Sequence, residues 1–206
     1  MKDRVQEAPP RPMARTTGFL YLLYFVTAIL GQFMVGHRLT VSGNVTNIIS
    51  TLIYVAVTVL FYGLFKPVSN SLSLLAALLS LAGCLFMSLG LIHIQSRISP
   101  LLFFGPFCLL IGYLILKSSF LPRFLGVLMV LAGPGWLAYL IPGVPLYLSR
   151  GMMVLGFLVE LSFCLWLLVK GVNVERWQQQ ASAASASIQF SETPPAGEAG
   201  RKTAPL

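Results

Sequence analysis

The sequence predicts an all-α integral membrane protein, a bundle of six transmembrane helices with both ends of the chain in the cytoplasm. Two observations carry this fold class. Of 206 residues, 56% are hydrophobic and only 10% are charged, whereas soluble domains carry about 25% charged residues. The apolar residues are also gathered into six runs, and each reaches the roughly 17–25 residues that cross a bilayer as a helix.

The six runs follow one another with short polar connections. Residues 1–16 are polar and basic and hold three prolines, which predicts a disordered cytoplasmic tail before a transmembrane domain at 17–171. The connections HRLTVSGN, KPVSNS, QSRIS, KSSFLPR and PGVPLYLSR are too short for crossovers, so successive helices should lie antiparallel. The predicted spans lie near residues 17–36, 45–65, 72–94, 100–116, 124–141 and 151–169.

The chain beyond the last apolar run changes in composition. Residues 172–206 are rich in Ala, Ser, Gln, Pro and Gly, which is typical of a largely disordered tail. Trp177 is expected at the cytoplasmic interface of the membrane, where indole rings are enriched.

The basic residues indicate orientation rather than a nucleic-acid partner. The net charge is +8, but no basic cluster alternates with aromatic residues that could stack on bases. Eleven lysine and arginine residues would lie on the side of the N-terminal tail, and only Arg38, Arg97 and Arg150 would lie on the other. Because cytoplasmic segments carry the excess of Lys and Arg, both termini are predicted to be cytoplasmic.

Glu160 is the only acidic residue between Glu7 and Glu175, and it lies in the middle of the sixth run. A carboxylate at membrane depth costs at least ~2.5–3.5 kcal/mol on insertion scales. Gly156 and Cys164, four residues away on either side, place small residues on the same helical face. Such faces let helices approach closely, so Glu160 should face protein rather than lipid. No Lys, Arg or His is expected at its depth, so we predict a mostly neutral carboxyl group at pH 7, because burial disfavours the charged form.

A neutral carboxylic acid donates a hydrogen bond and therefore needs an acceptor. Pro134 in the fifth run lacks an amide hydrogen and would free the carbonyl group of Val130, and the neighbouring glycines favour a kinked or unwound helix there. Thr58 and Ser80 are expected at the same depth. The candidate intramembrane polar site therefore comprises Glu160, Val130, Pro134, Thr58 and Ser80. Two roles stay open for it: a hydrogen bond that joins helices, or a proton or substrate site.

Small residues also recur at helical spacing, which is typical of helix interfaces in membranes. The helix-packing stripe is predicted to comprise Ala76, Ser80, Cys84 and Ser88 in the third run with Gly156 and Cys164 in the sixth. The alternative for the third run is a polar cavity wall.

The inventory of reactive side chains predicts no enzyme. Only His37 and His93 supply imidazoles, and the three cysteines form no close pair, so we expect no metal site, no cofactor and no disulfide framework. No nucleophile–base or metal-hydrolase motif is present.

Four segments resemble the bacterial membrane proteins grouped as the domain of unknown function 4386 family. They are RTTGFLYLLYFVTAILGQF, FYGLFKPVSNSLSLLAALLSL, a stretch that contains GYLILKSSFLPRFLG, and a stretch that ends in WLLVKGVN. The resemblance covers most of residues 15–173. It implies a multi-span protein of the bacterial inner membrane and offers no established activity, and an acidic residue is common at the position of Glu160.

These observations lead to two functional hypotheses. We expect a multi-pass inner-membrane protein that acts as a non-catalytic membrane subunit or scaffold, in contact with the lipid bilayer and with a second copy or another membrane protein. The alternative is a small transporter or proton-linked carrier that uses Glu160 beside a helix break at Pro134; its substrate is not predicted.

Overall fold

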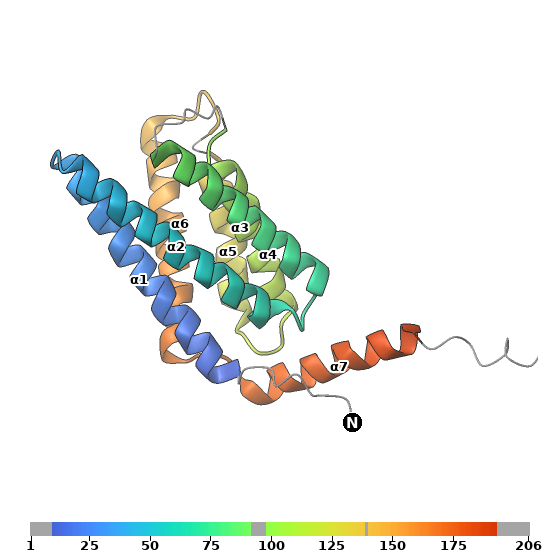
Figure 1. Cartoon of the computed structure of the whole chain (residues 1–206). Helices are drawn as coiled ribbons and strands as arrows, with labels where there is room; N and C mark the ends of the chain where they lie inside the picture. Colours follow the sequence, from blue (N-terminus) through green and yellow to red (C-terminus); the bar gives the residue numbers. More distant parts are fainter. Residues whose placement is uncertain (1–9, 92–97, 139, 193–206) are drawn as a thin grey trace, which may run out of the picture.

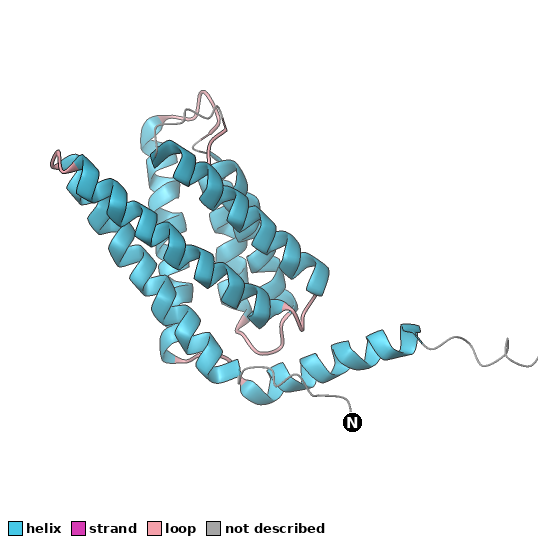
Figure 2. Cartoon of the chain, in the orientation of Figure 1, coloured by secondary structure: helices cyan, strands magenta, loops and turns pink. Residues whose placement is uncertain are grey.

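A computed structural model describes residues 10–91, 98–138 and 140–192 of the chain, and this part is helical throughout, with short connections (Figures 1 and 2). Its helices are α1 (Pro10–Gly36), α2 (Thr40–Phe65), α3 (Asn70–Leu91), α4 (Leu101–Lys117), α5 (Arg123–Ala138), α6 (Leu146–Val169) and α7 (Val174–Glu192). The all-α class predicted from the composition is confirmed.

The first six helices close into a ring. Each packs against its neighbour in sequence, from α1 to α6, and α6 packs back against α1. Helices α1, α3 and α5 begin, and α2, α4 and α6 end, at the end of the bundle where α7 starts (Figure 1). We call this the α7 end, and the other the opposite end.

Four of these helices are long and apolar enough to cross a membrane: α1, α2, α3 and α6. The remaining two helices of the ring are shorter, with 17 residues in α4 and 16 in α5. At 1.5 Å per residue they extend about 24–26 Å, less than the ~30 Å of a hydrocarbon core. The prediction of six spans therefore rests on the ring as a whole rather than on the length of each helix.

Both predicted tails contain helix, which corrects the expected boundaries. Residues 10–16 form the first turns of α1, since prolines are tolerated where amide hydrogens have no helical partner. Ala14 in this segment is fully buried. At the other end, α7 occupies residues assigned to the disordered tail, because Ala, Gln and Glu favour helix without being apolar. Residues 1–9 and 193–206 lie outside the described part.

Helix α5 is continuous through Pro134, so the unwinding considered from the sequence does not occur. Close packing on both sides holds the helix together. A Cβ atom at Gly133 would lie 2.9 Å from the carbonyl oxygen of Gly105, and one at Gly135 would lie 3.0 Å from that of Met152. The helix ends at Ala138, shortly before Pro142, since proline disfavours helical backbone at the residue that precedes it.

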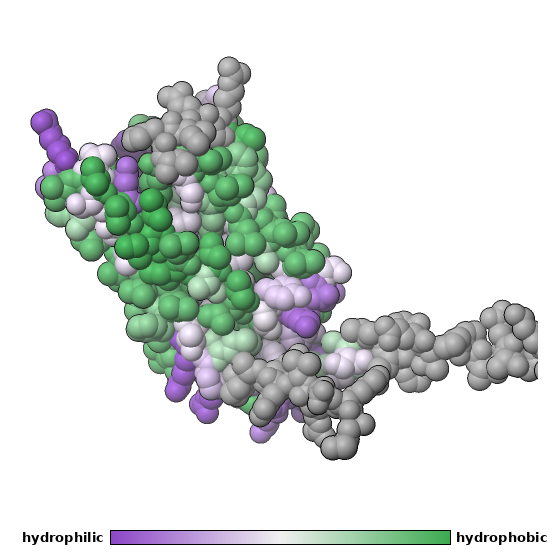
Figure 3. Space-filling model, in the orientation of Figure 1, coloured by the Kyte–Doolittle hydropathy of each residue, from purple (hydrophilic) through white to green (hydrophobic). Residues whose placement is uncertain are grey.

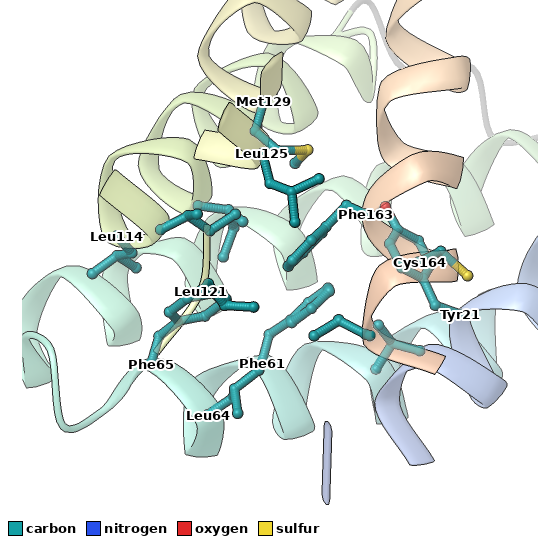
Figure 4. Packing of buried hydrophobic residues seen from close by; sticks show 14 of the residues in the cluster. Tyr21, Phe61, Leu64, Phe65, Leu114, Leu121, Leu125, Met129, Phe163 and Cys164 are labelled. Atoms are coloured by element: carbon teal, nitrogen blue, oxygen red, sulfur yellow. The ribbon is translucent and has the colours of Figure 1, made fainter. Parts of the chain in front are cut away.

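The outside of the ring is apolar and its ends are polar, as Figure 3 shows for one face. Large hydrophobic side chains on the outer face are exposed, among them Leu52 at 65%, Val59 at 61% and Leu131 at 59%. An apolar surface of this extent marks contact with lipid or another apolar partner. The interior holds buried aromatic and aliphatic side chains from several helices (Figure 4).

Candidate functional site

Glu160 points into the ring and is only 7% exposed. The small residues on its face bring neighbouring helices close. Gly156 lies against the indole ring of Trp136, 3.2 Å from where a Cβ atom would be. The Cys164 thiol donates to the carbonyl oxygen of Gly18 in α1 at 3.3 Å. Glu160 thus faces protein, as the small residues Gly156 and Cys164 on its helical face indicated.

Three side chains donate hydrogen bonds to the Glu160 carboxyl group. The Tyr21 hydroxyl in α1 donates to Oε2 at 2.5 Å. The Trp136 indole Nε1 in α5 donates to Oε1 at 2.8 Å, and the Cys108 thiol in α4 lies 3.5 Å from the same oxygen. One carboxyl group therefore ties α6 to three other helices.

The chemistry of these donors fixes the role of each oxygen. An indole N–H can only donate, so Oε1 is an acceptor. The tyrosine hydroxyl can donate or accept, so the contact at Oε2 is the place where a proton could be exchanged. A carboxylate has about four acceptor positions, and the three donors fill three of them. The site can thus hold the carboxyl group in either protonation state, and in the ionised state one acceptor position is left for a further donor.

The structure gives Glu160 other partners than the Val130 carbonyl group considered from the sequence. Within the described residues Val130 is not hydrogen-bonded to Glu160; its backbone nitrogen instead lies 2.7 Å from the position of a Cβ atom on Gly112, at the contact of α4 and α5. Because Pro134 leaves α5 helical, it opens no break toward the carboxyl group.

Thr58 and Ser80 form a separate polar pair between α2 and α3. Their hydroxyl oxygens are 2.6 Å apart, and the Thr58 hydroxyl also donates to the Tyr54 carbonyl oxygen at 3.0 Å. Both residues are buried. The structure thus brings together two of the five predicted site residues and leaves them unbonded to Glu160.

The stripe residues pack inside the chain. In α3, Ala76, Ser80 and Cys84 are buried, and the Ser88 hydroxyl donates to the Cys84 carbonyl oxygen at 2.9 Å. In α6, Gly156 and Cys164 contact α5 and α1 as described above. The buried stripe positions are therefore used within the chain, whereas Ser88 is half-buried and bonds within its own helix.

A small cavity lies beside Glu160, with a volume of about 50 Å³. It is lined by Tyr24, Tyr54, Met87, Leu101, Phe104, Trp136 and Glu160. Leu101 is the first residue of α4 and Trp136 lies near the last residue of α5. The cavity therefore extends from the carboxyl group toward the opposite end of the bundle.

Tyr54 forms part of the cavity wall and is 4% exposed. In the described part of the chain, every fully enclosed side-chain oxygen or nitrogen has a hydrogen-bond partner. The Tyr54 hydroxyl has no hydrogen bond there, so it is not fully enclosed.

On the other side of Glu160, toward the α7 end, aromatic rings close the interior. We call Tyr21, Phe61, Phe163, Phe65 and Phe120 the aromatic plug. Phe61 stacks on Phe163 with ring centroids 5.6 Å apart and meets Tyr21 edge-on at 5.6 Å (Figure 4). Phe65 continues the series toward Phe120 at 6.2 Å.

Helix α7 is attached at the same end. Trp177, expected at a membrane interface, is 5% exposed and donates from its indole nitrogen to the Leu64 carbonyl oxygen at 3.0 Å. The side-chain oxygen Oε1 of Gln180 accepts a hydrogen bond from the backbone amide of Ser119 at 3.1 Å. The first turns of α7 therefore bind the end of α2 and the connection between α4 and α5.

Other reactive groups do not assemble in the described residues. No group of three or more His, Cys, Asp and Glu side chains there could hold a metal ion. Cys84, Cys108 and Cys164 are free and buried. His93 lies outside the described part of the chain.

Comparison with known proteins places this site in a family. The family model for a domain of unknown function (DUF4386) matches residues 95–171, which include Cys108, Trp136 and Glu160. A protein of Archaeoglobus fulgidus named "Uncharacterized protein" is 31% identical over 150 residues, covering 68% of this chain and 90% of that protein. The chain belongs to the DUF4386 family. The resemblance seen in the sequence is thereby confirmed, and the archaeal relative shows that proteins similar to this DUF4386 chain are not confined to bacteria. No solved structure matches the chain.

Proposed function

We propose that this DUF4386 protein is a small membrane carrier that binds its solute or a proton at Glu160. The observation that carries the proposal is the cavity that Glu160 lines, which extends toward the opposite end of the bundle. A helix-joining carboxyl group needs only its hydrogen bonds, and a cavity beside it adds nothing to that role. Acids at membrane depth are functional candidates by default.

The carrier would cross the cytoplasmic membrane six times with both termini inside. The closed ring of helices supports six spans, because α4 and α5 are held between longer apolar neighbours. The charge distribution supports the orientation. Basic residues at the α7 end are Arg11, Arg15, Lys66, Lys117, Arg123, Lys170 and Arg176, whereas Arg38 and Arg150 lie at the opposite end. The cavity would then be on the outer side.

A second candidate is the non-catalytic subunit or scaffold. It is favoured by the three hydrogen bonds through which Glu160 joins α1, α4 and α5 to α6. The small-residue stripes are not available as its interface, however, because most of their residues are buried within the chain. A partner or second copy would have to bind the outer apolar face instead.

Proton flux in vesicles distinguishes the two functions. The purified protein is reconstituted into liposomes that contain a pH-sensitive dye, and an imposed pH gradient is followed over time. We expect Glu160→Gln to abolish protein-dependent flux, because the amide keeps the shape of the side chain but cannot exchange a proton. The matched control is Glu175→Gln, which changes an exposed acid in α7.

The result would favour the scaffold if Glu160→Gln protein were monodisperse, as thermally stable as wild type and equal to it in flux. A flux lost together with folding would be resolved by Trp136→Phe, which keeps the acid and removes one donor. Under the carrier proposal this variant still responds to the pH gradient.

A further inference from the structure

We infer that the cavity beside Glu160 is a binding site for a small organic cation, an alkylammonium ion with one charged nitrogen. The inference rests on the proposed function, since it names the class of solute that the carrier would take. Three features support it: an acid without a basic partner, a wall of aromatic rings, and the size of the cavity.

The first feature is the charge of the site. Within the described residues, the partners of Glu160 are the hydroxyl, indole and thiol groups of Tyr21, Trp136 and Cys108, all of them neutral donors. No Lys, Arg or His side chain there pairs with it, and the cavity wall contains none. The fourth acceptor position of the carboxylate therefore remains for an N–H donor of a ligand, and a cation would balance its charge.

The second feature is the aromatic wall. Four of the seven residues that line the cavity are Tyr24, Tyr54, Phe104 and Trp136. The rings are contiguous: Tyr24 and Tyr54 have centroids 4.6 Å apart, and Tyr54 meets Phe104 edge-on at 5.6 Å. Aromatic side chains around one space are typical of sites that bind organic ammonium ions, because the face of an aromatic ring is negative and attracts a cation.

The third feature limits the size of the ligand. A water molecule needs roughly 10–15 Å³ of cavity volume measured in this way, and the cavity holds about 50 Å³. It therefore accommodates about three to five non-hydrogen atoms, so methylammonium, with two, and trimethylammonium, with four, both fit.

Other classes of ligand match the wall less well. An anion would be repelled by a carboxylate. A hard metal ion takes about six or more oxygen ligands, whereas this wall offers the carboxyl group and tyrosine hydroxyls. Tyr54, a buried residue of this wall, contributes one hydroxyl group that has no hydrogen bond within the described residues.

Direct binding of radiolabelled methylammonium tests the inference on the full-length protein in detergent. We expect saturable binding that trimethylammonium, which keeps one N–H donor, displaces and that methanol, a neutral molecule similar in size to methylammonium, does not. Glu160→Gln should weaken binding roughly ten- to hundredfold, the range for a hydrogen bond to a charged group. Glu175→Gln should leave it unchanged.

The aromatic contribution is tested separately. Phe104→Leu should weaken methylammonium binding about two- to thirtyfold, as expected for loss of a cation–π contact. Thermal unfolding of Phe104→Leu in the same detergent shows whether leucine disturbs folding, since the tip of the Phe104 ring packs against Gly83 in α3. The matched control is Phe124→Leu, since Phe124 is exposed and packs on Trp166 away from the cavity.

The results of the binding, transport and proton-flux assays distinguish the alternatives. Equal displacement by potassium ion would overturn the inference in favour of an inorganic cation, and absence of saturable binding to folded protein would overturn it outright. Methylammonium binding without transport in vesicles would support the site and contradict the carrier. Proton flux that depends on Glu160 without methylammonium binding would support the carrier and contradict this class of solute.

Discussion

Trp136 and Glu160 face each other across the contact of α5 and α6, with the indole nitrogen 2.8 Å from the carboxyl oxygen. The same indole ring covers Gly156, one turn earlier in α6, and forms part of the cavity wall. One side chain therefore orients the acid, fills the space left by a glycine and contributes a ring to the proposed binding site.

Trp136→Phe separates these roles, because phenylalanine keeps an aromatic ring and removes the N–H donor. We expect the free energy of unfolding to fall by about 0.6–2 kcal/mol, the range measured for hydrogen bonds between membrane helices. Thermal unfolding in detergent measures this. Trp166→Phe is the matched control, since Trp166 packs on Phe124 without a hydrogen bond from its indole in the described residues. Equal losses in both variants would mean that ring size rather than the hydrogen bond matters.

Gly18→Ala tests the close contact between α1 and α6. A Cβ atom at Gly18 would lie 2.4 Å from the backbone nitrogen of Leu168, so the two helices would have to separate. Overpacking of this kind costs about 1–3 kcal/mol, and the melting temperature should fall accordingly. At Gly151, where no atom lies within 4 Å of the Cβ position, the same substitution should be neutral or slightly stabilising. The contact would be in doubt if both variants melted alike.

The pair formed by Thr58 and Ser80 can be measured in a double-mutant cycle. Thr58→Val and Ser80→Ala each remove one hydroxyl, and the double variant removes both. We expect a coupling free energy of about 0.6–1.7 kcal/mol, since the hydroxyl groups are buried between α2 and α3. Strictly additive losses would show that the two hydroxyls do not interact in the membrane.

Trp177→Phe should loosen α7 from the bundle. The variant keeps an aromatic ring in the buried position and loses the hydrogen bond to the Leu64 carbonyl oxygen, which costs about 0.5–1.5 kcal/mol. Amide hydrogen exchange in α7 should become faster while exchange in α6 stays the same. Gln179→Ala is the control, because Gln179 is exposed on the same helix. If hydrogen exchange in α7 is unchanged in the Trp177→Phe variant, the contacts of α7 with Ser119, and not the tryptophan hydrogen bond, hold the helix in place.

Orientation in the membrane is tested by cysteine labelling. Arg38→Cys places a thiol at the opposite end of the bundle and Gln179→Cys places one in α7, whereas the three native cysteines are buried. In intact cells, a membrane-impermeant maleimide should label the first variant and not the second, and permeabilised cells should allow both. Labelling of Gln179→Cys and not of Arg38→Cys in intact cells would contradict the proposed orientation and indicate the opposite one.

The helices of the ring could be predicted because hydropathy reports burial in lipid directly. The beginning of α1 and the whole of α7 could not, since a polar helix contains no apolar run that hydropathy could detect. Two long-range contacts hold α7 against the bundle: the hydrogen bond from Trp177 to Leu64 and the hydrogen bond between Ser119 and Gln180.

The site was predicted in part. Glu160 was identified by its unusual charge, and Gly156 with Cys164 gave its direction, because both arguments use residues of one helix. Tyr21 is 139 residues away in sequence, so its contact depends on the rotation of α1 in the ring, which periodicity does not determine. Val130 was assigned from local backbone chemistry, on the assumption that the acid needs an acceptor, whereas its actual partners are donors.

The aromatic plug separates the cavity from the α7 end of the bundle. Phe61 and Phe163 are buried at 3% and 0% exposure, and rings in a close-packed interior have no void to move into. Passage toward the α7 end therefore requires neighbouring helices to part, which is a slow collective motion. Under the proposed function, a ligand in the cavity would therefore reach the α7 end only during such a rearrangement.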